Sequence, residues 1–77
     1  MENQTISIAV EMIPVESSNI EAIGYKDWNK ELYVKYKSGT YIYHNVEKKL
    51  YEDLMKSESK GRFMNENIKS THTYNKL

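Results

Sequence analysis

The stretch "ELYVKYKSGTYIYHN" (residues 31–45) decides the fold, because apolar and polar side chains alternate on both sides of a Ser-Gly pair. Such alternation has a period of two and is typical of β-strands. Glycine adopts the positive φ that a tight hairpin turn needs, so Ser38-Gly39 predicts a two-residue loop. That loop places Tyr36 opposite Tyr41 and thereby sets the register of the whole hairpin.

The predicted register divides the hairpin into an apolar and a polar face, because cross-strand partners share a face. Lys37 then faces Thr40, Val34 faces Tyr43 and Leu32 faces Asn45. The apolar face carries Leu32, Val34, Tyr36, Tyr41 and Tyr43; the polar face carries Tyr33, Lys35, Lys37, Thr40, Ile42 and His44. We expect the rings of Tyr41 and Tyr43 to pack inside, with hydroxyls that reach a partner or water. The alternative is that both rings contact a ligand.

Two further strands are predicted before the hairpin. "TISIAVEM" (5–12) alternates in the same way, and Pro14 ends this strand or places it at a sheet edge. "IEAIGYK" (20–26) is the second, and its Gly24 allows a bulge or the close approach of another segment. The turn "DWNK" (27–30) leaves Trp28 either folded over the sheet or exposed.

The carboxyl-terminal part predicts one main helix. Apolar residues recur at helical spacing over residues 46–58, with Asn45 as N-cap and Gly61 as the residue that ends the helix. "RFMNENIK" predicts a short final helix or turn, and residues 70–77 a flexible polar tail. We therefore predict an α+β domain over residues 1–69, with an antiparallel sheet of about four strands and one helix packed on one face.

Composition limits the function classes. The chain has 77 residues, no Cys and a formal net charge of zero. No apolar run is long enough to span a membrane, and the amino terminus lacks the pattern of a signal peptide, so we expect a cytoplasmic protein. Residues 1–23 contain four Glu and no Lys or Arg, whereas all 11 basic residues follow. This polarity can steer an anionic partner.

No catalytic pattern is present. His44 and His72 have no neighbouring carboxylates at ligand spacing, and without Cys there is no thiolate site, so we predict no metal and no cofactor. Ser17 and Ser18 have no adjacent base and no nucleophile-elbow context. We therefore expect a protein that is not an enzyme.

Two groups of residues are candidates for ligand binding. The first is the segment "SESKGRFMN", where Ser59, Lys60, Gly61, Arg62 and Asn65 would hold a phosphate at a helix start; the alternative is a simple helix-ending loop. The second is the polar hairpin face, where Tyr33, Lys35, Lys37 and His44 combine flat rings with cations, as single-strand binders do. The alternative there is an ordinary solvated face.

Three spaced signatures resemble the KTSC domain, a small module of bacteria and phages named for the carboxyl end of some lysyl-tRNA synthetases. They are "VESSNIEAIGYK" with Ser17 and Ser18, "LYVKYKSGTYIYHNV" with Tyr41 and Tyr43, and "LYEDLMKSESKGRFMNENI" with a late S-x-G-x-aromatic-x-N. The match runs over residues 12–68, which leaves strand 5–12 as an addition. The family usually has Pro where Glu47 stands and often Phe where Tyr36 stands.

The resemblance implies a module without established enzymatic activity, for which the synthetase context suggests RNA binding. We therefore expect a partner that is RNA, single-stranded nucleic acid or a nucleotide. The alternative is a protein–protein module, such as a phage inhibitor that acts on a host protein or sequesters a signalling nucleotide as an oligomer. Its contacts would be Trp28 and the amino-terminal strand, which could also join two copies of the chain. The bias towards Lys, Asn, Ile and Tyr points to an AT-rich bacterial or phage genome.

Overall fold

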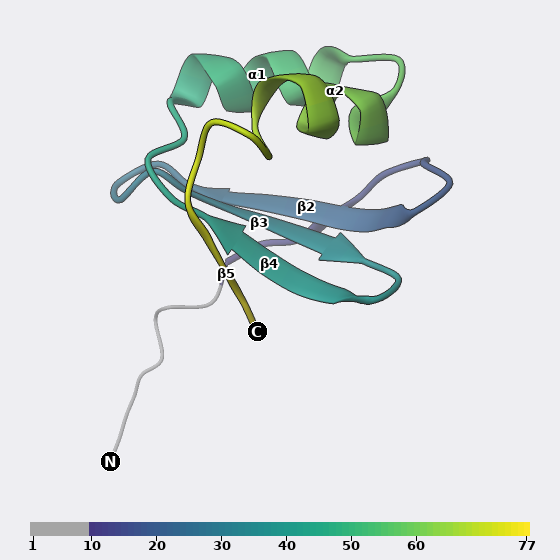
Figure 1. The fold of residues 1–77 in the computed structure, drawn as a ribbon, viewed down its shortest axis with the longest axis horizontal. Helices are drawn as coiled ribbons and strands as arrows, with labels where there is room; N and C mark the ends of the chain where they lie inside the picture. The colour runs from purple at the N-terminus through teal and green to yellow at the C-terminus, as the bar shows by residue number, and fades with distance from the viewer. Residues whose placement is uncertain (1–9) are drawn as a thin grey trace.

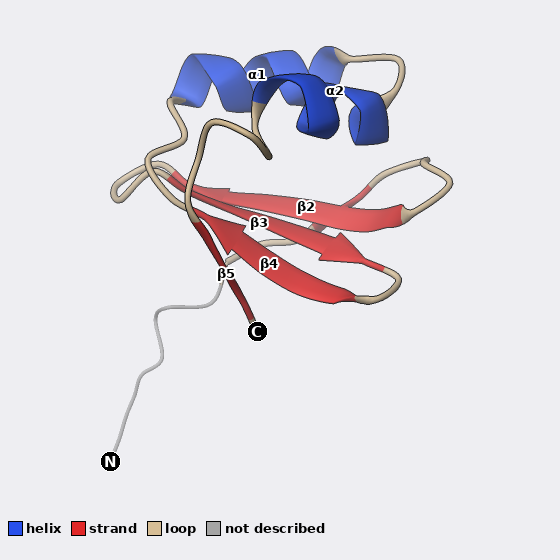
Figure 2. Ribbon diagram, viewed as in Figure 1, coloured by secondary structure: helices blue, strands red, loops and turns tan. Residues whose placement is uncertain are grey.

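The computed structural model describes residues 10–77, which form an antiparallel sheet with two helices on one face (Figures 1 and 2). The five strands lie in sequence order across the sheet. Their bounds are β1 Ile13–Pro14, β2 Ile20–Lys26, β3 Glu31–Tyr36, β4 Gly39–Tyr43 and β5 Tyr74–Lys76; the helices are α1 Lys48–Lys56 and α2 Lys60–Asn67. The predicted α+β class is confirmed, but the sheet has five strands instead of about four, and there are two helices of similar length.

The β3–β4 hairpin forms with a different register from the predicted one. Val34 lies opposite Tyr41 and Tyr36 opposite Gly39, so the two loop residues are Lys37 and Ser38. The required positive φ falls on Gly39, at 148°, as the first residue of β4. The register differs from the predicted one by two residues, and side chains alternate with a period of two. The predicted division into faces is therefore unchanged.

The apolar face of the hairpin carries the core. Leu32, Val34 and Tyr43 are buried there, as predicted, beneath the two helices. The helices contribute side chains at helical spacing. The buried cluster contains Ile20, Ile23, Leu32, Val34, Tyr36, Tyr43, Val46, Leu54, Met64 and Ile68. Tyr25 fastens β2 to α1, because its ring stacks on Tyr51 at 4.6 Å and its hydroxyl donates to the Val46 carbonyl at 2.6 Å.

The amino-terminal strand predicted over residues 5–12 falls largely outside the described residues. Residues 10–12 are not in a strand, and β1 begins at Ile13 with Pro14 at the sheet edge. These residues pass close against Gly24: a Cβ there would lie 2.7 Å from the Glu11 carbonyl oxygen. Gly24 thus serves the close approach that the sequence allowed, because any side chain would collide with this backbone.

Both helix boundaries differ from the predicted ones. Asn45 is not the N-cap of α1: its φ is 59°, a left-handed conformation that Asn tolerates, and it turns the chain between β4 and the helix. The helix begins after Glu47. Gly61 does not end a helix but lies in the first turn of α2, where Ser59 is the N-cap. Glycine suits this position because the Asn19 side chain packs against it: a Cβ on residue 61 would lie only 3.1 Å from the Asn19 side-chain oxygen.

The segment predicted as a polar tail contains the fifth strand. Tyr74 pairs with Tyr43 and Lys76 with Tyr41, so β5 completes the hydrogen bonding of β4 on the side away from β3. A segment of three residues with mixed polarity is too short to show the alternation of a strand. The strand forms because the free edge of β4 offers its backbone N–H and C=O groups as hydrogen-bond partners. Within residues 10–77 no helix is long and apolar enough to cross a membrane.

Candidate functional site

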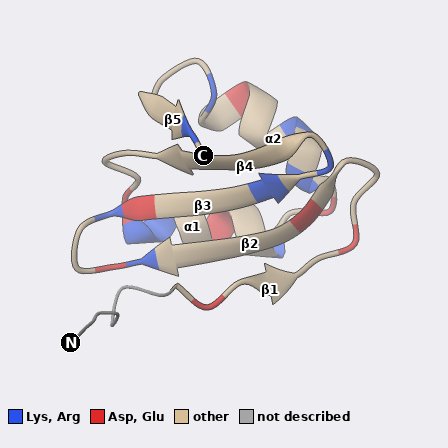
Figure 3. Ribbon diagram, turned by 90° about the horizontal axis from the view of Figure 1, so that it is seen from below, with Lys and Arg blue, Asp and Glu red and all other residues tan. Residues whose placement is uncertain are grey.

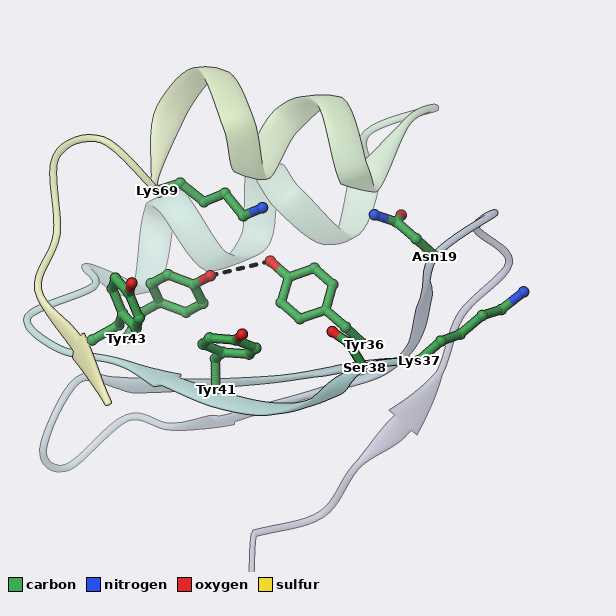
Figure 4. Close-up of a pocket in the computed structure, with 8 residues that line it drawn as sticks. Asn19, Tyr36, Lys37, Ser38, Tyr41, Tyr43 and Lys69 are labelled. Carbon is green, nitrogen blue, oxygen red and sulfur yellow. Dashed lines mark hydrogen bonds between the residues drawn. The ribbon is translucent and has the colours of Figure 1, made fainter. Parts of the chain in front are cut away.

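A cavity of about 490 Å³ opens between the sheet and the end of α2, and we call it the tyrosine pocket (Figure 4). Strands β3, β4 and β5, the β1–β2 loop and the segment after α2 all contribute to it. Its lining residues are Asn19, Tyr36, Lys37, Ser38, Tyr41, Tyr43, Lys69 and Tyr74. Four of these eight side chains are tyrosines, which come together because Tyr36, Tyr41, Tyr43 and Tyr74 all project from the helix-covered face of the sheet.

The four rings form one continuous aromatic surface. Tyr41 stands at its centre: its ring lies edge-on to Tyr36 at 5.4 Å and near Tyr74 at 5.6 Å, measured between ring centroids. Tyr43 extends the surface, 6.5 Å from Tyr41 and 5.7 Å from Tyr74. Tyr43 is buried as predicted, whereas Tyr41 is half-buried and Tyr74 is 55% exposed. The surface therefore runs from the core to solvent.

The hydroxyls of Tyr36 and Tyr43 meet in the interior of the pocket, 3.2 Å apart, as the dashed line in Figure 4 marks. Burial raises the pKa of Tyr36 well above its ordinary value, and its hydrogen bond with Tyr43 adds to this effect. Burial also raises the pKa of Tyr43, partly offset by the same hydrogen bond. Both phenols are therefore neutral hydrogen-bonding groups near pH 7, unsuited to act as a phenolate nucleophile or base.

Among residues 10–77, the charged side chains in the lining of this pocket are Lys37 and Lys69, and Lys76 approaches the lining residue Tyr41. The Lys69 ammonium lies 5.1 Å from the Tyr36 ring centroid, and the Lys76 ammonium lies 5.7 Å from that of Tyr41. Lys37 stands at the β3–β4 turn, at one end of the cavity (Figure 4). Among residues 10–77 none of these three lysines forms a salt bridge. The pocket is therefore electropositive and attracts anions.

A second cavity of about 500 Å³, which we call the serine pocket, brings together the predicted phosphate-binding residues and the Ser-Ser pair. The β1–β2 loop meets the first turn of α2 here. The lining residues are Glu16, Ser17, Ser18, Asn19, Glu58, Ser59, Lys60, Gly61, Arg62 and Asn65. Asn19 lines both cavities. Two separate sequence signatures thus meet in one place, which spacing along the chain could not show.

The cations of the serine pocket already have partners within the protein. Arg62 donates to the Glu66 carboxylate at 3.0 Å, and Lys60 donates to the Ser57 carbonyl at 3.0 Å. The Ser59 hydroxyl accepts the Arg62 backbone N–H and so occupies one of the free donors of the helix start. Glu16 and Glu58 in the lining oppose the approach of an anion.

The polar face of the hairpin brings Tyr33, Lys35 and His44 together, as the register predicts. Each has a partner there: Lys35 lies 3.8 Å from Glu21, His44 lies 3.7 Å from Glu31, and the Tyr33 ring lies 5.0 Å from the Lys26 ammonium. Strands β2 and β3 each carry one acidic and one basic residue, Glu21 and Lys26 in β2 and Glu31 and Lys35 in β3, as the colours in Figure 3 show. This face therefore has no uniform sign of charge. Trp28, in the β2–β3 turn, is 70% exposed.

Of the eight lining residues of the tyrosine pocket, sequence reasoning named Tyr41 and Tyr43 and placed Lys37 on the polar face. It missed Asn19, Tyr36, Ser38, Lys69 and Tyr74. The lone Tyr74 in an otherwise polar segment was an available signal, since such a ring usually packs against something. Lys69 carried no signal, because it is brought over Tyr36 only when α2 folds back across the sheet. Among residues 10–77 no three His, Asp or Glu side chains are grouped so that they could hold a metal ion.

Comparisons with known proteins agree with this fold. The family model of the KTSC domain matches residues 16–74 of this chain. A protein of Tsukamurella paurometabola is 44% identical over 59 residues, which cover 75% of this chain and 88% of that protein. The crystal structure of a KTSC domain protein from Yersinia pestis is 36% identical and superposes with a TM-score of 0.86, over 90% of this chain and 99% of the other. The chain therefore belongs to the KTSC domain family.

Proposed function

We propose that this domain is a small non-catalytic binding module that takes a nucleotide, free or at the end of single-stranded RNA or DNA, in the tyrosine pocket. One observation carries the proposal: four tyrosine rings and two lysine side chains line a cavity to which residues 10–77 contribute no carboxylate. A nucleotide has the matching chemistry, since its base is a flat ring and its phosphate is an anion.

The dimensions and energetics of the pocket support this ligand class. A cavity of about 490 Å³ lies in the usual range for small-molecule sites. The exposed part of the aromatic surface, Tyr41 and Tyr74, offers ring faces for stacking, which contributes about 1–3 kcal/mol per base in single-strand binders. Lys37 and Lys69 line the cavity, and the Lys76 ammonium lies 5.7 Å from the Tyr41 ring centroid, so these charges attract phosphate.

The raised pKa values of Tyr36 and Tyr43 support binding without chemistry. A catalytic tyrosine works through a phenolate or a readily transferred proton, which requires a pKa nearer to 7. These two phenols hold their protons more firmly than free tyrosine does. They are suited to hydrogen bonding and to shape recognition.

The test is an NMR titration of ¹⁵N-labelled protein with the four ribonucleoside 5′-monophosphates and with short single-stranded RNA and DNA. We expect shifts around Tyr41, Tyr74 and Lys69, with affinity that falls as salt rises. Tyr41→Leu should weaken binding by about tenfold or more, because it removes a stacking face. The matched control is Tyr33→Leu on the opposite face of the same hairpin, which should bind normally.

Two outcomes would contradict this assignment. Shifts confined to the serine pocket, around Lys60–Asn65, would move the ligand to the site that the sequence favoured. No shift with any nucleotide or oligonucleotide would remove nucleotide binding as the function of this chain.

A second candidate function rests on Trp28. An indole with 70% of its surface exposed is typical of an anchor residue for a protein partner, and edge residue Ile13 is also exposed. Trp28 lies in the β2–β3 turn and Lys37 in the β3–β4 turn, at opposite ends of β3, so the two surfaces are separable. Trp28→Ala should abolish binding to a protein partner, or self-association seen by sedimentation, without affecting nucleotide affinity.

A further inference from the structure

The hydroxyl pair inside the tyrosine pocket has an unused hydrogen. Tyr36 and Tyr43 together carry two phenolic hydrogens, and their mutual bond consumes one. Among residues 10–77 no other group accepts from either hydroxyl. The two residues are only 7% and 2% exposed. Because both residues line a cavity, water or an acceptor atom of a ligand can take this hydrogen, and a ligand oxygen can replace the water.

A cation converges on the same point. Lys69 follows α2, and its side chain reaches down towards the two hydroxyls (Figure 4). Its ammonium is held over the Tyr36 ring at 5.1 Å, without a salt bridge among the described residues. Two hydroxyls and one ammonium, from β3, β4 and the segment after α2, thus line the same cavity. The complement of one phenolic hydrogen and one ammonium is an anion with several acceptor oxygens.

The place of this point in the pocket indicates which kind of phosphate fits. Tyr36 and Tyr43 are core residues beneath α2, so a group bound at their hydroxyls has protein behind it. An internal phosphodiester needs room for a sugar on both sides. A terminal phosphate has one substituent, which can extend outwards along Tyr41 towards Tyr74 and solvent. A terminal phosphate also carries about −1.5 to −2 charges at pH 7, more than a diester.

We propose that Tyr36, Tyr43 and Lys69 form a receptor for a terminal phosphate monoester, whose attached nucleoside lies against Tyr41 and Tyr74. This inference rests on the proposed nucleotide-binding function and specifies its ligand. Two sources carry the same chemical group: a free nucleoside 5′-monophosphate and the 5′-phosphorylated end of single-stranded RNA.

The experiment compares ligands that differ only in this group, by calorimetry on the full chain. The probes are adenosine and uridine, their 5′-monophosphates and 3′,5′-cyclic monophosphates, and an octameric RNA with and without a 5′-phosphate. We expect each monophosphate to bind at least tenfold more tightly than its nucleoside and its cyclic form. Inorganic phosphate should compete with the monophosphate. If only the 5′-phosphorylated octamer binds tightly, the source is the RNA end; if the free monophosphate binds as tightly, it is the nucleotide.

Three variants locate the anion. The double substitution Tyr36→Phe with Tyr43→Phe keeps both rings and removes both hydroxyls, and Lys69→Met removes the cation at an exposed position. Each should reduce the preference for monophosphate over nucleoside by about tenfold, measured as the ratio of the two affinities in the same variant. Lys60→Met, in the serine pocket, is the matched control and should retain the full preference. Circular dichroism and thermal melting verify that each variant is folded before its affinity is measured.

The outcomes separate this inference from the broader proposal. Equal affinity for nucleoside and monophosphate, or an unchanged preference in Lys69→Met and in the double Phe variant, would overturn the phosphate receptor while nucleotide binding stood. A preference lost in Lys60→Met would place the phosphate in the serine pocket and also overturn it. If no probe binds at all, both the receptor and the proposed function fail.

Discussion

The tyrosine pocket and the serine pocket are similar in volume and share Asn19, yet they differ in how their polar groups are used. In the serine pocket, Arg62 is paired with Glu66, Lys60 with a carbonyl and Ser59 with the helix start. In the tyrosine pocket, Lys69 is held over a ring, and one phenolic hydrogen has no acceptor among residues 10–77. A cluster of polar residues indicates binding capacity only where its partners are not already inside the protein.

The two pockets also differ in their relation to the core. Tyr36 and Tyr43 are core residues that face the cavity, whereas the serine pocket consists of a loop and a helix end at the surface. Changes in the tyrosine pocket should therefore alter both stability and binding. Changes in the serine pocket should alter local geometry and little else. The following measurements test that contrast.

The largest expected effect is that of Tyr43→Ala. Removal of a buried aromatic ring typically costs about 3–5 kcal/mol in free energy of unfolding, a large share of the stability of so small a domain. Ser18→Ala, at an exposed position of the serine pocket, should cost less than about 0.5 kcal/mol. Urea denaturation measures both. Similar costs for the two substitutions would remove the distinction between the pockets.

A second effect appears at alkaline pH. Tyr36 and Tyr43 have pKa values raised above the ordinary 10.0, so above about pH 10 the unfolded chain loses protons that the folded chain retains. The stability from this source is complete below pH 10 and is lost as the pH rises towards the folded-state pKa. Each such tyrosine contributes a fall of about 1.4 kcal/mol per pH unit.

Tyr36→Phe removes one of the two titrating phenols. The fall of unfolding free energy with pH should therefore be less steep by about 1.4 kcal/mol per pH unit. Ser18→Ala should leave it unchanged, because no tyrosine lines the serine pocket. Thermal or urea unfolding from pH 9 to 12 measures the slope. An unchanged slope in Tyr36→Phe would mean that its phenol is accessible to solvent in the folded state.

A smaller effect concerns the contact between Asn19 and Gly61. Replacement of a helical Gly by Ala usually stabilises a protein by about 0.5–1 kcal/mol. In Gly61→Ala the new Cβ would lie 3.1 Å from the Asn19 side-chain oxygen, so this contact should offset the gain in stability. In a protein that already carries Asn19→Ala, Gly61→Ala should stabilise by the full amount. A double-mutant cycle by urea denaturation gives the coupling, and additive effects would show that Asn19 moves freely from this position.

The smallest expected effect is that of Arg62→Gln. An exposed pair four residues apart on a helix contributes about 0.2–0.5 kcal/mol, and the Arg62–Glu66 pair is of this kind. Stability should fall by no more than that, and nucleotide affinity should change less than twofold. A larger loss of affinity would indicate that the serine pocket takes part in binding after all.

The sequence by itself determined the class of the fold, the hairpin and the division of its faces. Alternation in β3 and β4 decides which side chains share a face, and this assignment survives a two-residue shift in register. It therefore placed Tyr41 and Tyr43 on the covered face, although the loop proved to be Lys37-Ser38. Local patterns also located β2 and both helical segments, because period and composition are properties of a single stretch of chain.

Tertiary structure alone decided the composition of the candidate site. Tyr74 joins the aromatic surface because β4 has a free edge for β5, and Lys69 reaches the Tyr36 ring because α2 crosses the sheet. The helix ends differ from the predicted ones for the same reason. Gly61 lies inside α2 against Asn19, and Asn45 turns the chain before α1. These contacts join residues up to about 40 positions apart along the chain. Their formation depends on the packing of the whole core, which no short stretch of sequence encodes.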